Sequence, residues 1–339
     1  MFLVTTANQK FWKKDTKVLF LGEWCKVYSQ RHVWSGMDYQ VLPYHWDDRK
    51  KLRKDFLYLD ELCERYLPVL AGELNSLHGV NYSSRYWRIL IGPWLILFIQ
   101  ILYDRYLSVS AAIDTGKVTE TWVAPSMPHY YILKDYATLI RYMPTDEYSQ
   151  YLYGYLIKSL RGIPFQVKNE TLTPPSATQK NEAGLTQITL IGIRKVLEWY
   201  RRMIPDRWNE VVFVESYLNF SDQARLQLSL GQFPCRIAPR VVIRESPVDL
   251  EMRRALKLSE GKNQFEKLLD ELIPINIFRT CVEGYSEMNE ISCAAFPKRP
   301  RVIYTTNALY YYDAFKFWTA SHVEHGVKLI VGQHGGNYG

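Results

Sequence analysis

The sequence predicts an α/β fold: a Rossmann-like, mostly parallel sheet with helices on both faces. Short apolar runs end at glycine, proline or a polar residue, as buried strands do. Longer segments between these runs carry apolar residues three and four positions apart, which is typical of helices with one buried face. Strands that alternate with helices build parallel sheets covered on both sides. With 47% hydrophobic and 14% aromatic residues, the chain can fill such a core and is not expected to be disordered.

The first half of the chain begins this alternation. Strands are predicted at residues 17–22, 39–44 and 120–126, and helices at 47–77, 83–108, 129–142 and 146–160. Asp47 and Asp48 stand at the start of the helix predicted at residues 47–77, where negative charges are stabilised by the helix dipole.

One apolar segment, "WRILIGPWLILFIQILY" at residues 87–103, is tested as a membrane span. A spanning helix needs about 20 apolar residues. This run is shorter, contains Arg88 and Gln100, and is interrupted by Gly92 and Pro93. We therefore expect a buried helix kinked at Pro93.

The second half repeats the pattern after a segment rich in Pro, Thr, Asn and Gly, residues 161–186, which we expect to be an exposed loop excursion. Strands are predicted at 210–216, 301–307 and 327–332, and helices at 187–202, 221–231, 262–293 and 308–326.

Charge and cysteine content argue against disulfide-bonded and zinc-binding classes of protein. The net charge of +7 is mild for 339 residues and is not concentrated in a Lys/Arg block; it favours a basic face on a soluble protein over an attraction to phosphorylated substrates or an anionic membrane. Five cysteines without a CxxC pair indicate neither a disulfide framework nor a zinc site. We expect a cytoplasmic protein without a signal peptide, without a cofactor or metal, and without a nucleic-acid partner.

Ligands of parallel sheets gather beyond the carboxyl ends of the strands. This rule selects residues 22–24, 125–126, 215–216, 305–307 and 333–336, which we expect along one edge of the sheet.

The segment "VGQHGGNYG" at residues 331–339 is the most distinctive of these strand ends. Gly335 and Gly336 let the backbone approach a ligand, so His334 is a candidate general base. A tight turn with a locally bonded histidine explains the same residues. Glu23 is the second candidate base, and its alternative role is to cap the following segment.

Other residues are candidates for substrate binding. They are Gln333, Gly335, Gly336, Asn337, Asn307, Arg88 and Asp47. Arg88 fits either a phosphate contact or a surface salt bridge, and Asp47 fits either a ligand contact or a helix cap among solvated charges. Dinucleotide, P-loop, serine-hydrolase and zincin motifs are absent from the sequence.

Four segments, "KVLFLGEWC", "VLPYHWDDRKKL", "HGVNYSSRYWRILIGPWLILFIQILYDRY" and "VGQHGGNYG", together resemble a family of transferases encoded in bacterial O-antigen and capsule loci. Residues 333–335 are also similar to the Gln-His-Gly motif of capsule-type Kdo transferases and to the His-Gly of polyol-phosphate polymerases. The resemblance implies a GT-B architecture, in which two Rossmann-like lobes face each other across a cleft.

On this resemblance, residues 1–339 are expected to form the N-terminal, acceptor-side lobe. The nucleotide-binding lobe is then missing, as in a truncated chain, and this chain alone should be inactive. The implied activity is transfer of a sugar from a nucleotide-activated donor to a glycan or lipid-linked acceptor, with peripheral contact at the inner membrane. Transfer of a polyol phosphate and a non-catalytic glycan-binding scaffold are the alternatives.

Overall fold

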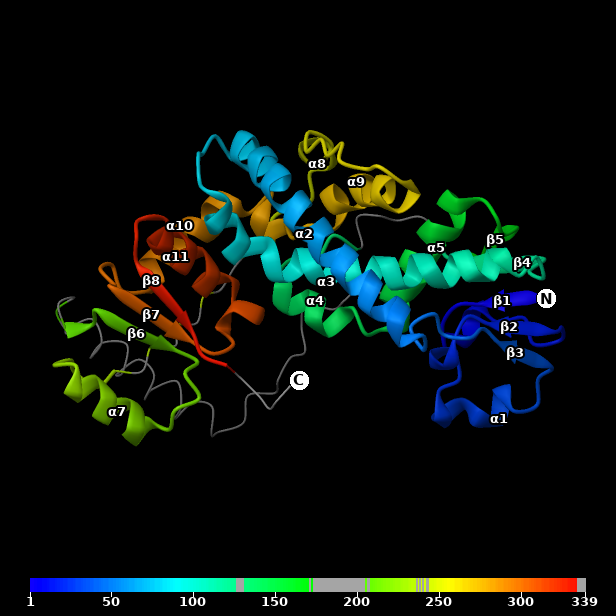
Figure 1. The fold of residues 1–339 in the computed structure, drawn as a ribbon, viewed down its shortest axis with the longest axis horizontal. Coiled ribbons are helices and arrows are strands. Elements are labelled where there is room, and N and C mark those ends of the chain that lie inside the picture. The colour runs from blue at the N-terminus through cyan, green and yellow to red at the C-terminus, as the bar shows by residue number, and fades with distance from the viewer. Residues whose placement is uncertain are drawn as a thin grey trace.

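The computed structural model describes residues 1–125, 131–170, 172, 205, 208–235, 237, 239, 241 and 244–333. Within these residues the chain is a mixed α/β protein with parallel sheets flanked by helices, so the predicted fold class is confirmed. The sheets lie toward the two ends of an elongated molecule, with long helices between them (Figure 1).

The first sheet has five parallel strands in the order β3-β2-β1-β4-β5. They are β1 (Phe2–Val4), β2 (Val18–Phe20), β3 (Tyr39–Val41), β4 (Glu120–Val123) and β5 (Phe165–Val167). The central strand β1 is fully buried, and its register pairs Leu3 with Leu19 on one side and Thr121 on the other. The carboxyl ends of β1, β2 and β3 therefore meet at one edge.

The second sheet has three parallel strands in the order β6-β7-β8. They are β6 (Val211–Val214), β7 (Val302–Thr305) and β8 (Lys328–Val331). β7 is central, while β8 lies at the edge and exposes Ile330 and Val331.

The expectation that all predicted strand ends lie along one sheet edge is wrong. The strands divide into two sheets, so Glu23 follows a strand of the first and Asn307 follows a strand of the second. The physical reason is that an apolar run specifies a buried strand but not its partner.

Helices fill the space between and around the sheets. Near the first sheet and along the molecule run α1 (Arg31–Trp34), α2 (Arg49–His78), α3 (Ser84–Asp114), α4 (Tyr136–Tyr142) and α5 (Asp146–Leu160). The second half adds α7 (Phe220–Ser229), α8 (Leu250–Arg254), α9 (Gln264–Asn276), α10 (Tyr285–Ala295) and α11 (Asp313–Glu324). α2 begins because the Asp48 carboxylate accepts the N–H groups of Lys50 and Lys51, and it ends at Gly79 with a left-handed φ of 63°.

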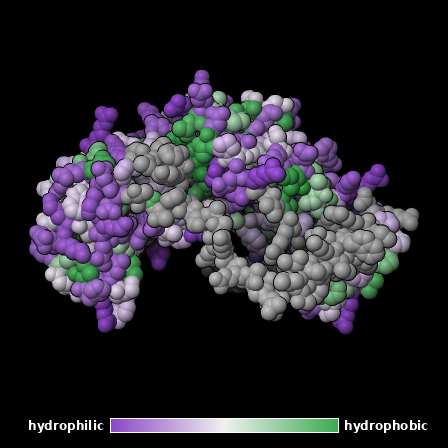
Figure 2. Space-filling view, turned by 180° about the vertical axis from the view of Figure 1, so that it is seen from behind, coloured by the Kyte–Doolittle hydropathy of each residue, from purple (hydrophilic) through white to green (hydrophobic). Residues whose placement is uncertain are grey.

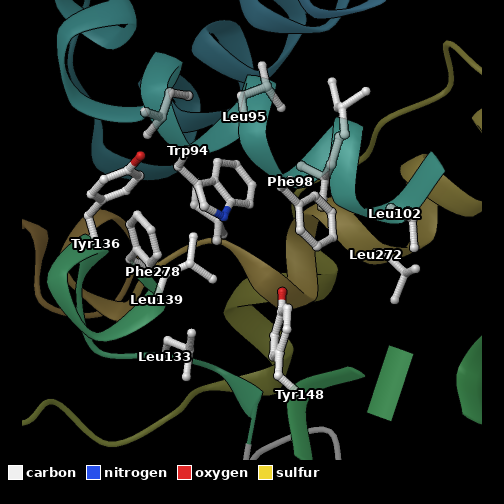
Figure 3. Packing of buried hydrophobic residues seen from close by; sticks show 14 of the residues in the cluster. Trp94, Leu95, Phe98, Leu102, Leu133, Tyr136, Leu139, Tyr148, Leu272 and Phe278 are labelled. Carbon is white, nitrogen blue, oxygen red and sulfur yellow. The ribbon is translucent and has the colours of Figure 1, made fainter. Parts of the chain in front are cut away.

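The core is built around α3. Figure 3 shows Trp94, Leu95, Phe98 and Leu102 of this helix facing side chains from α4, α5 and α9. Trp94 stacks on Phe98 with a centroid separation of 5.4 Å and meets Phe278 edge-on at 5.8 Å. Aromatic pairs of this geometry add stability beyond the area they bury. This core joins α3 to α4, α5 and α9.

α3 is also the one helix of the described residues that is long and apolar enough to cross a membrane by length and composition. In the structure, 56% of its most apolar window is buried by protein. It packs against α2, α5 and α11, as the sequence interpretation of a buried helix requires. The helix continues unbroken through Pro93 to Asp114.

Several predicted elements differ in detail from the structure. Strands β1 and β5 were not predicted, and β5 lies inside the segment 161–186 that was expected to be a loop excursion. Its three residues are exposed, and most of the remaining segment lies outside the described residues. The predicted helix at 262–293 is two helices, α9 and α10. The predicted helix at 187–202 also lies outside the described residues.

Candidate active site

A cavity of about 1220 Å³ lies at the carboxyl ends of β1, β2 and β3. Its walls come from the loops that follow these strands and from α3 and α5. From behind, the molecule is hollowed between the part that carries the first sheet and the rest (Figure 2). A large cavity at the carboxyl edge of a parallel sheet is the position where α/β proteins bind ligands.

The loop after β1 is fixed to α5 by hydrogen bonds. The hydroxyls of Thr5 and Thr6 donate to Oε1 of Gln150, at 3.2 and 2.9 Å. The N–H of Ala7 donates to Oδ1 of Asp146 at 3.1 Å. These bonds hold the Asp146 carboxyl at the cavity wall.

Asp146 is a partly buried carboxyl in this wall. Burial raises the pKa of Asp146, the neighbouring Glu147 charge adds to the rise, and the hydrogen bond from Ala7 opposes it. A carboxyl that lines a cavity and has its pKa raised by burial is a candidate general base.

The loop after β2 brings Glu23 and Trp24 to the cavity. The Trp24 indole N–H donates to the Thr5 carbonyl at 3.0 Å, which fixes the ring against the β1 loop. The Glu23 side chain is 76% exposed and forms an ion pair with Lys26 at 3.0 Å. Glu23 is therefore a cavity carboxylate with little burial.

Asp104 of α3 binds the side chains that form the cavity wall beside the loop after β3. Its carboxylate accepts the Tyr44 hydroxyl at 2.9 Å and Nη1 of Arg105 at 2.9 Å. Nε2 of His45 lies 3.4 Å from the same carboxylate. Nη2 of Arg105 donates to the Ser149 hydroxyl on α5 at 3.2 Å. These contacts connect the loop after β3 to α3 and α5. Burial, together with the Asp104 charge, raises the pKa of Tyr44, so its hydroxyl stays neutral.

The cavity carries more carboxylates than cations. Its charged lining residues are Lys10, Glu23, Asp47, Asp104, Arg105, Asp146 and Glu147. Carboxylates accept hydrogen bonds from hydroxyl groups, and they repel phosphates. The electrostatics of the cavity suit a neutral molecule with many hydroxyl groups.

The carboxyl edge of the second sheet holds a separate polar group. Glu215 and Tyr217, after β6, have left-handed φ angles of 53° and 57°. The amide of Asn307, after β7, donates to the Tyr217 hydroxyl at 2.6 Å. The Tyr311 hydroxyl donates to the Glu215 carboxylate. Non-glycine residues with φ above zero are uncommon and often mark functional loops.

The predicted site residues that the structure describes lie at the cavity of the first sheet, at the carboxyl edge of the second sheet and on the surface. Glu23 and Asp47 line the cavity of the first sheet. Asn307 and Gln333 follow strands of the second sheet. Arg88 makes a bidentate ion pair with Glu64, with both N–O distances 2.6 Å, so the structure places it in the surface salt bridge that was its alternative role.

Four predicted residues, His334, Gly335, Gly336 and Asn337, lie outside the described residues. The proximity of His334 to Glu23 therefore stays a prediction. Gln333 belongs to the second sheet edge, whereas Glu23 belongs to the first.

Sequence reasoning missed the cavity residues that come from helices. Asp104, Arg105 and Asp146 were passed over because the carboxyl-end rule examines only the residues after strands. A signal was present for Asp104 and Arg105, two adjacent charges inside a helix whose preceding turns are apolar except for Gln100.

Metal binding has no candidate among the residues that the structure describes. No group of three or more His, Cys, Asp or Glu side chains there could hold an ion. The five cysteines are free thiols, and four of them are buried.

Comparison with known protein families identifies a match over the whole chain. The family model described as LIC12162 family transferase matches residues 1–339. No curated protein and no solved structure matches the chain.

Proposed function

The chain belongs to the LIC12162 family of transferases, and on that premise we propose that it transfers a sugar from a nucleotide-activated donor to a hydroxyl of a glycan acceptor. The resemblance of its strand-end motifs to transferases of O-antigen and capsule loci supports this substrate class. A bacterial surface polysaccharide is then the product.

The cavity of the first sheet is the observation that carries the proposal. Its volume of about 1220 Å³ accommodates an oligosaccharide end rather than a single small group. Trp24 and Tyr44 supply aromatic surface, and the excess of carboxylates supplies acceptors for sugar hydroxyls. The same excess repels the phosphates of the donor, so we assign the cavity to the acceptor.

A cavity carboxylate acts as general base in this proposal. It takes the proton of the acceptor hydroxyl while the hydroxyl oxygen bonds to the anomeric carbon. The bond between that carbon and the donor phosphate breaks, and the nucleotide leaves with the bonding electrons. Asp146 is the better candidate, since its pKa is raised by burial and Ala7 fixes its position. Glu23 is the second, because it is more exposed and paired with Lys26.

The experiment has a binding arm and a transfer arm. Thermal-shift measurements with CMP, CDP, UDP and GDP sugars identify the donor nucleotide. Saturation-transfer NMR with neutral oligosaccharides and with sugar phosphates then measures what the cavity binds. We expect neutral oligosaccharides to bind, and V27R, which places a large cation at the cavity wall, to reduce their binding.

Catalysis is tested in a preparation that shows nucleotide release dependent on the acceptor. D146N should lower the turnover number about 100-fold to 10,000-fold while acceptor binding is retained. The control is E251Q, because Glu251 is exposed on α8 and does not line the cavity. Preferential binding of sugar phosphates would contradict the acceptor assignment. Unchanged turnover in both D146N and E23Q would exclude a carboxylate base in this cavity and would favour the scaffold alternative.

A further inference from the structure

The first two turns of α2 form an exposed surface that combines cations with large apolar side chains. We define the α2 face as Arg49, Lys50, Arg53, Lys54, Phe56 and Leu57. Phe56 is 53% exposed and Leu57 is 52% exposed, although both are large apolar side chains on a helix. Exposed apolar residues gathered beside cations indicate an interaction surface.

Helical geometry places these six side chains on one side. Successive residues of an α-helix are turned by about 100°, so positions 49, 53, 56 and 57 point in similar directions, with 50 and 54 beside them. The opposite side is buried: Asp55, Leu59 and Leu62 face the core. The exposure of Phe56 and Leu57 is thus a property of the helix face and not of a frayed end.

The cations of the α2 face are unpaired within the part of the chain that the structure describes. No ion pair there involves Arg49, Lys50, Arg53 or Lys54, whereas Lys51, on the inner side, binds the buried Asp55 at 2.5 Å.

The acidic residues near the α2 face limit its extent. The Asp48 carboxylate is occupied as the helix cap. Asp47 lies before the helix, and Asp60 and Glu61 follow one turn beyond Leu57. The positive region is therefore confined to the first two turns.

We propose that the α2 face binds the surface of an anionic lipid bilayer. Lys and Arg near such a surface are attracted by the negative headgroups, while Phe and Leu enter the boundary between headgroups and acyl chains. The two contributions come from the same side of one helix. This inference goes beyond the proposed transfer activity and does not depend on it.

Docking in this way brings the cavity close to the membrane. Tyr44 and Asp47 line the cavity, and α2 begins two residues after Asp47. Val27, which also lines the cavity, is 42% exposed, and the next residue, Tyr28, is 73% exposed. An acceptor carried by a lipid would reach the cavity mouth without leaving the bilayer surface.

Vesicle co-sedimentation tests the proposal with the full chain. Vesicles of phosphatidylcholine containing about one third phosphatidylglycerol are compared with vesicles of phosphatidylcholine alone. We expect binding to the anionic vesicles, with weakening at high salt because the surface charges are screened. The R53Q/K54Q variant should bind roughly 30-fold more weakly. Each Lys or Arg near an anionic surface contributes about 1 kcal/mol, and every 1.4 kcal/mol is a tenfold change in affinity. The F56S/L57S variant should bind more weakly at every salt concentration.

A matched control removes two exposed cations elsewhere. Lys298 and Arg299 follow α10, and K298Q/R299Q should bind vesicles as the wild type does. Circular dichroism checks that each variant is folded. Equal binding to both vesicle types, equal losses in R53Q/K54Q and K298Q/R299Q, or binding to a nucleic-acid duplex but not to vesicles would overturn the proposal. None of these outcomes bears on the transfer assay.

Discussion

Removal of the Asp104 carboxylate should lower the free energy of unfolding. The size of the loss depends on how deeply Asp104 and its partner Arg105 are buried in the cavity wall. The side chains of Asp104 and Arg105 are only 14% and 18% exposed. In D104A the Arg105 guanidinium loses its carboxylate partner in a mostly buried place, which costs about 3–5 kcal/mol. In D104N an oxygen remains to accept the Tyr44 hydroxyl, and the loss is about 1.5–3 kcal/mol for bonds to a charged group.

These free energies convert into measurable shifts. Unfolding entropy of about 2.1 cal/mol/K per residue gives roughly 0.7 kcal/mol per kelvin for a chain of 339 residues. The melting temperature should then fall by about 4–7 °C in D104A and about 2–4 °C in D104N. Differential scanning calorimetry measures the shifts, and urea unfolding followed by tryptophan fluorescence gives the free energies.

A double-mutant cycle measures the interaction energy between Asp104 and Arg105. D104A, R105A and D104A/R105A should show a coupling energy of about 1–3 kcal/mol, because each single change leaves the other group buried and unpaired. A D104A melting temperature within about 1 °C of wild type, or single effects that add within about 0.5 kcal/mol, would refute the role of Asp104 as the organiser of the wall.

Three further predictions follow from buried groups. The raised pKa of Asp146 means that the folded state binds this proton more tightly, so its contribution to stability falls as pH rises from the ordinary aspartate pKa to the raised one. D146N should therefore unfold at the same or a higher urea concentration than wild type at pH 7, with no advantage at pH 3; lower stability at pH 7 would contradict this sign. K316M should lose about 3–5 kcal/mol in urea unfolding, because Lys316 pairs with Asp313 at 2.7 Å and the two side chains are 2% and 4% exposed; a loss below about 1 kcal/mol would contradict it. Burial raises the pKa of the Cys25 thiol to about 12, so its labelling by a disulfide reagent, followed by peptide mass spectrometry, should be about 1000-fold slower in the folded than in the unfolded chain; comparable rates would contradict this.

The sequence predicted the long elements of the fold because their patterns are long. α2 and α3 extend over 30 and 31 residues, which gives many turns of apolar spacing and clear ends. β1 and β5 have three residues each, too few to show a period; β2 and β3 are equally short, but Gly22 and Pro43 mark their ends, and no such residue follows β1 or β5 closely. The division into two sheets could not be predicted either, since strand pairing depends on contacts between distant segments.

The candidate site was predicted where it follows strands. Glu23 was selected because it follows a strand and Asp47 because it stands at the start of a predicted helix, and both line the cavity. Asp104 and Asp146 could not be found in this way, because the fold brings α3 and α5 against the β1 and β3 loops. Arg88 could not be assigned from sequence because its partner, Glu64, lies on a different helix.

A crystal structure of the chain with a neutral oligosaccharide acceptor would test the central claim most directly. We predict that the glycan lies against Trp24 and Tyr44, with one hydroxyl within hydrogen-bond distance of the Asp146 carboxylate. A glycan bound at the carboxyl ends of β6, β7 and β8, with the first-sheet cavity empty, would contradict it.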